Sequence, residues 1–270
     1  MPIHISRLLL DTLDEHWRRY RISLIDCRHD CSENAVHELR FAIRRLLAML
    51  ALLTTLNPKA RAGKLQRLLK TQLDCLNALR DTQVMLLEIG NTATTLAELK
   101  PFLQDLQAQE SRLLAETRAF IKTIPSGKIK RKCKKLHSRC KARRADKTAL
   151  LEAVDKVYGT ALQRYLAVDP HQLPSLHHLR ISMKKLRYLL LDIQPWLPDQ
   201  DKDQLPAIKD YLTLLGDIQN SAVLTAALTS FYHDGLPTAI AAYYQAQQQA
   251  LLDRFMLEKV QIYDFWRVNP

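Results

Sequence analysis

The stretch at residues 36–50, VHELRFAIRRLLAML, organises the chain because it occurs twice. It returns 140 residues later as LHHLRISMKKLRYLL, at residues 176–190. With about 3.6 residues per turn, the histidine and the cations of each copy fall on one arc of a helix, and the large apolar residues fall on the arc beside it. Long charged side chains normally lie opposite the core. The pattern therefore predicts helices whose cations point along a seam between neighbours.

The repeat extends beyond these two stretches. Lys70 and Lys209 occupy matching positions 139 residues apart, and LNALRDTQV at 76–84 matches LGDIQNSAV at 215–223 with the same offset. Two long blocks at a nearly constant offset indicate a duplicated helical unit. We therefore expect an all-α fold of two tandem four-helix bundles, formed by residues 1–145 and 146–270.

Composition agrees with a helical protein. The 270 residues are 47% apolar and 25% charged, as in soluble globular proteins, and include only 6 glycines and 11 prolines. Leu, Ala, Gln, Lys and Arg are abundant, which favours helix, and no period-two alternation predicts a sheet.

Start and stop signals predict eight helices. Ser32 is the expected N-cap of the helix with the first motif, and Gly90-Asn91 is the expected left-handed end of the third helix. Pro101 is expected to kink or restart the fourth. The expected ranges are 3–26, 33–56, 59–89, 95–123, 146–167, the second motif up to Gln194-Pro195, 199–232 and 237–263.

The positive charge is concentrated in one segment. The chain carries +12, and residues 128–144 hold ten basic residues and no acid, so the rest of the chain carries only +2. This segment is amphipathic and is expected to run into or abut the helix at 146–167. Such a charge attracts anionic partners, but it does not choose between nucleic acid, an acidic membrane and an inorganic polyanion. A solvated face is the ordinary alternative.

The cysteines indicate a reducing compartment. There are five, an odd number, without paired CxxC spacing. Cys133 and Cys140 share an apolar helical face and are expected to be core thiols. The start of the chain does not resemble a signal peptide, and no apolar run reaches a membrane-spanning length. We expect a cytoplasmic protein that does not enter membranes.

The two motif histidines, His37 and His177, have three possible roles. Neither has a second histidine or a carboxylate at metal-ligand spacing, and no nucleophile accompanies them for general-base catalysis. A ligand of an anion and a structural histidine remain as the two interpretations.

The cations beside the histidines favour anion binding more strongly. Arg40 and Arg44 in the first copy, and Arg180, Lys184 and Arg187 in the second, lie next to the core stripe, where few carboxylates share their arc. The alternative is that their stems cover apolar surface while their charged ends reach water. Unneutralised cations beside a core repel one another, so an anion would stabilise them.

At this point the sequence resembles the CHAD family, the conserved histidine α-helical domain. The resemblance rests on the doubled H-x-x-R-x-x-x-[RK]-[RK]-L at 37–46 and 177–186, on LRDTQV and LGDIQN, and on Phe265-Trp266-Arg267. It covers residues 3–267. It implies pseudo-symmetric bundles with a basic groove between them, binding of inorganic polyphosphate, and association with polyphosphate granules.

The resemblance also assigns residues. Some family members carry a triphosphate-hydrolysing domain with an ExExK signature, which this chain lacks, so no catalytic residue, metal or cofactor is expected. The alternatives are a nucleic-acid-binding protein that uses the same basic surface and a polyphosphate-processing enzyme. The candidate polyphosphate ligands are His37, Arg40, Arg44, Arg45, Lys70, Arg80, Lys132, Lys135, His177, Arg180, Lys184, Lys185, Arg187 and Lys209.

The two copies differ at informative positions. Leu47 stands where the second copy has Arg187, and Gln219-Asn220 replace Arg80-Asp81. These differences predict that the two halves of the site are unequal. The sequence also favours a ligand without bases, because single-strand binders interleave aromatic residues with cations and Tyr188 is the only aromatic residue beside the second motif.

Overall fold

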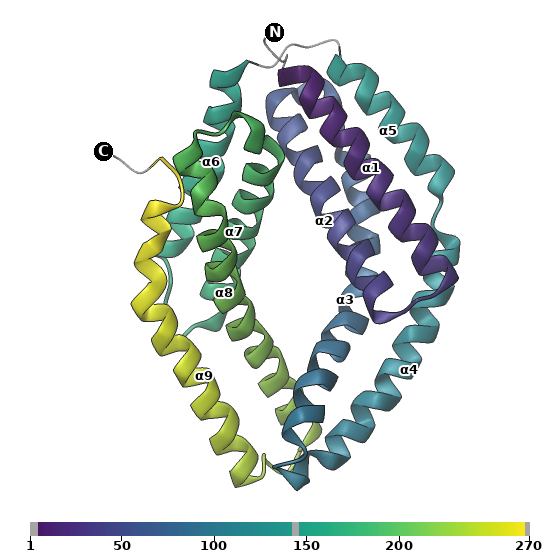
Figure 1. Cartoon of the computed structure of the whole chain (residues 1–270). Coiled ribbons are helices and arrows are strands. Elements are labelled where there is room, and N and C mark those ends of the chain that lie inside the picture. The colour runs from purple at the N-terminus through teal and green to yellow at the C-terminus, as the bar shows by residue number, and fades with distance from the viewer. Residues whose placement is uncertain (1–4, 142–145, 268–270) are drawn as a thin grey trace. The chain divides into compact units, whose positions relative to one another are not determined.

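The computed structural model describes residues 5–141 and 146–267, and these form helices and no strand (Figure 1). This confirms the predicted all-α fold. The α-helices are α1 (Ile5–His29), α2 (Glu33–Leu56), α3 (Gly63–Thr92), α4 (Lys100–Thr123), α5 (Ser126–Lys141), α6 (Lys147–Leu166), α7 (Leu173–Ile193), α8 (Asp199–Phe231) and α9 (Thr238–Glu258). Short 3₁₀ turns cover Pro58–Ala60, Ala97–Leu99, Gln194–Trp196 and Lys259–Asp264.

Most helix ends lie where the local chemistry predicts them. Ser32 caps α2, and its Oγ accepts a hydrogen bond from the Ala35 N–H at 3.4 Å. The helix ends before Asn57-Pro58, since a residue preceding proline avoids the helical conformation. Pro101 lies in the first turn of α4, where its missing N–H costs no hydrogen bond.

One expectation about a helix boundary was wrong. Helix α3 continues through Gly90 to Thr92, and Gly90 does not take a positive φ. Ile89 and Ala93 on either side are buried in one apolar cluster, so tertiary packing outweighs the weak helix propensity of glycine. The basic segment forms a helix, α5, as far as Lys141, and the expected junction with the helix at 146–167 falls on residues 142–145, which lie outside the described residues.

The chain divides into two compact units. One contains residues 1–81 and 110–155, and the other contains residues 82–109 and 156–270. Each unit therefore holds one motif helix, α2 in the first and α7 in the second. This grouping differs from the sequence halves 1–145 and 146–270, because the end of α3 and the start of α4 belong with the C-terminal helices. The bundle boundaries and the groove between bundles stay predictions.

In the first unit, α1 packs along α2, and α5 packs on α1 (Figure 1). Tyr20 is fully buried and donates from its hydroxyl to Gln72 Oε1 at 2.8 Å, which joins α1 to α3. The apolar face of α5 buries Cys133 and Cys140 together with Ile129 and Leu136, so the prediction of core thiols is confirmed. The cations of α5 are thereby held on its other faces.

In the second unit, α7 and α9 pack against α8 (Figure 1). An apolar cluster joins the end of α3 and the start of α4 to α8 and α9, with Phe102 and Tyr244 among its largest members. At the other end of α8, Tyr211 packs edge-on against Phe265, with ring centroids 5.2 Å apart. These two contacts hold α8 at both ends. Within the described part of the chain, no helix has the length and hydropathy needed to cross a membrane.

Candidate anion-binding site

A cationic pocket lies between α7 and α8, inside the second unit. Its cavity volume is about 310 Å³. Four residues predicted from the sequence line it, three from α7 and one from α8. The full lining is Arg180, Lys184, Arg187, Tyr188, Lys209, Leu212, Thr213, Gly216, Asp217 and Asn220.

The packing of α7 explains why its cations face α8. The apolar stripe of α7, which includes Leu179, Met183 and Leu186, is buried, so the adjacent stripe lies at the edge of the core. Arg180 and Lys184 on this edge are half-buried, as expected for stems that lie on apolar surface. Lys185, one position further round, is exposed and lies outside the pocket lining.

A glycine lets one guanidinium lie directly against α8. A Cβ added to Gly216 would be 3.4 Å from Arg180 Nη2 and 3.6 Å from its Nε. A Cβ alone would make ordinary van der Waals contact there, whereas a longer side chain would compete with Arg180 for space. Glycine matters at position 216 because it has no side chain.

Arg187 contributes a second guanidinium to the pocket. Its Nε is buried, and among the described residues it has no hydrogen-bond partner. A buried N–H without an acceptor costs roughly 1–3 kcal/mol. The planar guanidinium matches two phosphate oxygens at once, so an anion in this pocket would supply the acceptor.

One carboxylate, Asp217, stands among the four cations. Loss of hydration raises its pKa, and the charges of Arg254 and Arg180 act in the opposite direction. Because the net shift is upward, the carboxylate takes up a proton more readily than an exposed aspartate does. Asp217 therefore reduces the positive charge of the pocket in a way that depends on pH.

His177 lies outside the pocket lining but is tied to α8. Its Nδ1 is 2.6 Å from Gln219 Oε1, and because an amide oxygen can only accept, Nδ1 carries the proton. In a neutral ring, Nε2 is then an acceptor. His177 can offer a second N–H to an anion only when the ring is positively charged.

The first copy uses the equivalent positions differently. Arg40 is only 5% exposed, and its Nη1 donates to Asn77 Oδ1 at 2.6 Å. Asn77 occupies the sequence position of Gly216, so it places a side chain where the second copy has none. Arg80, at the position of Gln219, pairs with Glu33 at the start of α2.

The remaining first-copy candidates lie nearer the surface. Arg44 and Arg45 are half-buried on α2, whereas Lys70 on α3 and His37 on α2 are exposed. The structure thus places these side chains on two helices that the Arg40–Asn77 hydrogen bond and the Arg80–Glu33 ion pair join. The predicted continuous groove that joins them to the second copy stays a prediction.

The basic helix α5 forms a separate cationic surface with the start of α3. Reduced hydration lowers the pKa of Lys132, and the neighbouring charges of Lys64, Lys128, Arg131 and Lys135 lower it further. Like charges this close attract anions. Lys132 is half-buried and Lys135 exposed, so both are accessible for that role.

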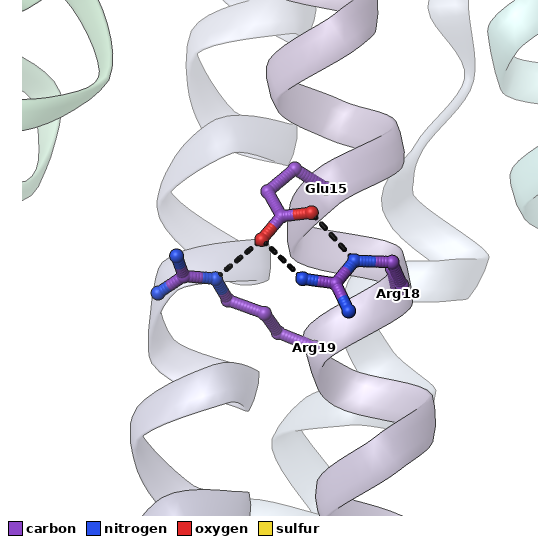
Figure 2. Close-up of polar contacts among 3 residues, drawn as sticks. All are labelled: Glu15, Arg18 and Arg19. Carbon is purple, nitrogen blue, oxygen red and sulfur yellow. Dashed lines mark hydrogen bonds and ion pairs between the residues drawn. The ribbon is translucent and has the colours of Figure 1, made fainter.

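Some basic residues are already neutralised. On α1, Glu15 accepts hydrogen bonds from Arg18, at 2.7 and 2.9 Å, and from Arg19, at 2.7 Å (Figure 2). These bonds, first from Arg18 and then from Arg19, lower the pKa of Glu15 to about 2. Since the carboxylate is charged at neutral pH and shared by both arginines, we do not count this group as anion-binding.

Sequence reasoning missed several residues of these cationic sites, Gly216 among them. Thr213 and Asp217 follow Lys209 at helical spacing on α8, so extending the face of Lys209 along the helix would have found them. Lys64 has no such signal, because only folding brings the start of α3 near α5. Among the described residues, no group of three or more metal-ligating side chains forms a metal site.

Comparison with known proteins identifies the family. A CHAD domain profile matches residues 7–229, which is most of the chain. The chain belongs to the CHAD domain family. A comparison with curated proteins gives no match.

Two solved structures share the fold. The CHAD domain from the plant Ricinus communis has a TM-score of 0.70 and 18% identity, and the match covers 97% of this chain and 90% of that one. PptA from Streptomyces chartreusis has a TM-score of 0.71 and 14% identity, over 97% of this chain and 99% of that one. At such identities, the likeness supports the fold alone.

Proposed function

We propose that this CHAD protein binds inorganic polyphosphate without cleaving it, through the pocket between α7 and α8. The observation that carries the proposal is that Arg180, Lys184, Arg187 and Lys209 line a single cavity. Arginine forks and lysine ammonium groups are the donors that phosphate oxygens prefer. The basic surface of α5 and the cations of α2 are further places in the first unit to which phosphate can bind.

The lining of the pocket favours a polyanion without bases. Tyr188 is its only aromatic member, whereas proteins that bind single strands offer several aromatic faces for stacking. The neutral lining residues Thr213 and Asn220 can donate to phosphate oxygens as well. A linear phosphate chain needs only this charge and spacing.

The non-catalytic part of the proposal rests on the sequence. The sequence has no ExExK signature, which marks the triphosphate-hydrolysing domain that some family members carry. We place the protein in the cytoplasm, where its five cysteines, all free thiols here, would remain reduced. Association with polyphosphate granules follows if a long chain offers many binding sites at once.

One competition experiment tests the proposal. Labelled polyphosphate is bound at fixed salt and displaced by unlabelled polyphosphate, duplex DNA or single-stranded RNA of equal total charge. We expect polyphosphate to displace the label at a lower concentration than either nucleic acid, with no phosphate released in the presence of Mg²⁺. Stronger displacement by nucleic acid, or phosphate release that follows the purified protein, would overturn it.

A further inference from the structure

Two buried thiols face each other where α1 ends. Cys27 lies in the last turn of α1, and Cys31 lies in the connection to α2, next to the N-cap Ser32. Their Sγ atoms are 3.7 Å apart, and both residues are free thiols. The side chains are buried, with 2% and 3% of their surface exposed, so the pair is held inside the first unit.

The backbone here suits a disulfide. The Asp30 N–H donates to Asp26 O at 2.8 Å, so the helical spacing continues to within one residue of Cys31. Residues four apart at this spacing have Cα atoms about 6 Å apart. Disulfides span roughly 4.4–6.8 Å between Cα atoms, with sulfurs about 2.05 Å apart. The sulfurs, now 3.7 Å apart, would have to approach to about 2.05 Å to close the bond.

The environment makes the two thiols unequal. The hydrogen bond with Cys27 lowers the pKa of Cys31, and the charge of Arg118 lowers it further, while burial and Asp30 oppose this shift. The same hydrogen bond, with burial, raises the pKa of Cys27. Cys31 is thus the thiol that ionises more readily of the two. A thiolate with a protonated thiol beside it is the arrangement that thiol oxidation needs.

We propose that Cys27 and Cys31 form a reversible intramolecular disulfide when the protein meets a peroxide. The Cys31 thiolate attacks one oxygen of hydrogen peroxide, the O–O bond breaks, and Cys31 becomes a sulfenic acid as hydroxide leaves. The Cys27 sulfur then attacks the Cys31 sulfur, and the S–O bond breaks. The thiol proton of Cys27 leaves with the departing hydroxyl as water. The two sulfurs are oxidised by two electrons in total, and the peroxide is reduced.

The disulfide would form next to the start of α2. Residues 28–30 and 32–34, on either side of Cys31 in the sequence, are exposed. Ser32 caps α2, and Glu33 pairs with Arg80 on α3. The disulfide would draw Cys31 toward α1. Because Cys31 directly precedes the N-cap Ser32, this movement would act on the start of α2, the helix that carries His37.

Differential alkylation tests the proposal in the wild-type protein. The folded chain is titrated with hydrogen peroxide, free thiols are blocked, and the chain is digested without reduction. We expect a Cys27–Cys31 linked product as the first oxidation product, with two hydrogens lost and both thiols restored by dithiothreitol. Cys75, which is more exposed, is the internal control. At peroxide doses that link the pair, Cys75 should still be a free thiol and should be fully alkylated in the blocking step.

A variant separates the two steps. In Cys27→Ser, the resolving thiol is gone, so Cys31 should accumulate as a sulfenic acid that dimedone traps. Oxidation of Cys75 before Cys31, a linkage between other cysteines, or loss of only one thiol in the wild type would each overturn the proposal. The chemical readout in the wild type does not depend on any variant folding, or on polyphosphate binding.

Discussion

The helix pairs α2/α3 and α7/α8 share one repeated sequence pattern, yet the motif arginines of the two pairs make different contacts. In the first pair, the motif arginine Arg40 is buried and donates to Asn77. In the second, Arg180 is half-buried and lies against Gly216 beside a pocket. At one position, Asn77 in the first copy accepts a hydrogen bond from Arg40, whereas Gly216 in the second copy leaves room for Arg180 at the edge of a cavity. A repeated motif therefore does not imply two equal sites.

The largest effect is expected from removing charge on the pocket side of this comparison. Hydrogen bonds to charged groups contribute about 1.5–3 kcal/mol each, so Lys184→Ala combined with Arg187→Ala should weaken polyphosphate binding by roughly 100-fold or more. Isothermal titration calorimetry measures it. The matched control is Arg18→Ala with Arg19→Ala, which removes the same charge from the group around Glu15. Equal losses in the two double variants would mean that only net charge matters.

The second prediction concerns stability, and it tests the other side of the comparison. Arg40→Ala removes a buried hydrogen bond to Asn77 and should lower the free energy of unfolding by about 1–3 kcal/mol. Arg180→Ala should cost less, because the Arg180 side chain is half-buried, whereas Arg40 is only 5% exposed. Urea denaturation of both variants measures the difference. If Arg180→Ala is the more destabilising change, the assignment of structural and ligand roles is reversed.

The third prediction exchanges the deciding residue. Gly216→Asn gives the second copy the residue of the first and places a Cβ 3.4 Å from Arg180 Nη2. We expect polyphosphate affinity to fall by roughly 10-fold, the loss of about one charged hydrogen bond. Gly90→Asn is the control, since a Cβ there meets nothing within 4 Å. Unchanged affinity in Gly216→Asn would show that the close approach of Arg180 to α8 is not needed.

The smallest expected effect is that of Asp217, which has an alanine, Ala78, at its position in the first copy. Its raised pKa means that the charged form is disfavoured in the folded protein, so this group's contribution to stability is present at low pH and lost as pH rises through the folded pKa. A bound polyanion disfavours the charged form further.

Asp217→Asn should therefore tighten polyphosphate binding by roughly threefold at pH 7, and the gain should vanish as the pH falls through the pKa of Asp217. Binding curves from pH 4 to pH 8 measure it. Asp210→Asn, on the same helix but outside the pocket lining, is the control. A gain that is the same at every pH, or equal in Asp210→Asn, would rule out a local effect of Asp217.

Sequence patterns predicted the elements of this comparison better than its outcome. Helical periodicity placed the cations beside the core stripe, and the Ser32 cap and the proline boundaries were found from local chemistry alone. The extension of α3 through Gly90 was not predicted, because it depends on packing with residues of α8 and α9 that are distant in the sequence.

The inequality of the two copies was expected from Leu47 and Gln219, but its cause at Asn77 and Gly216 was not. The role of Gly216 depends on the side chain that lies against it, and this side chain, Arg180, comes from another helix. The same holds for Lys64, whose neighbours on α5 are far away in the sequence. Non-local contacts of this kind leave no periodic signal.

The central claim is that guanidinium groups of the second copy donate to phosphate, and the arginine Nε–H signals in a ¹⁵N-correlated NMR spectrum test it most directly. Tripolyphosphate is titrated into labelled protein, with the signal of Arg187 assigned from its loss in Arg187→Lys. The account predicts a large, saturable shift of the Arg187 and Arg180 signals, while Arg40 stays unmoved because it is bonded to Asn77. Shifts confined to the arginines of α5, or a larger shift for Arg40 than for Arg187, would contradict it.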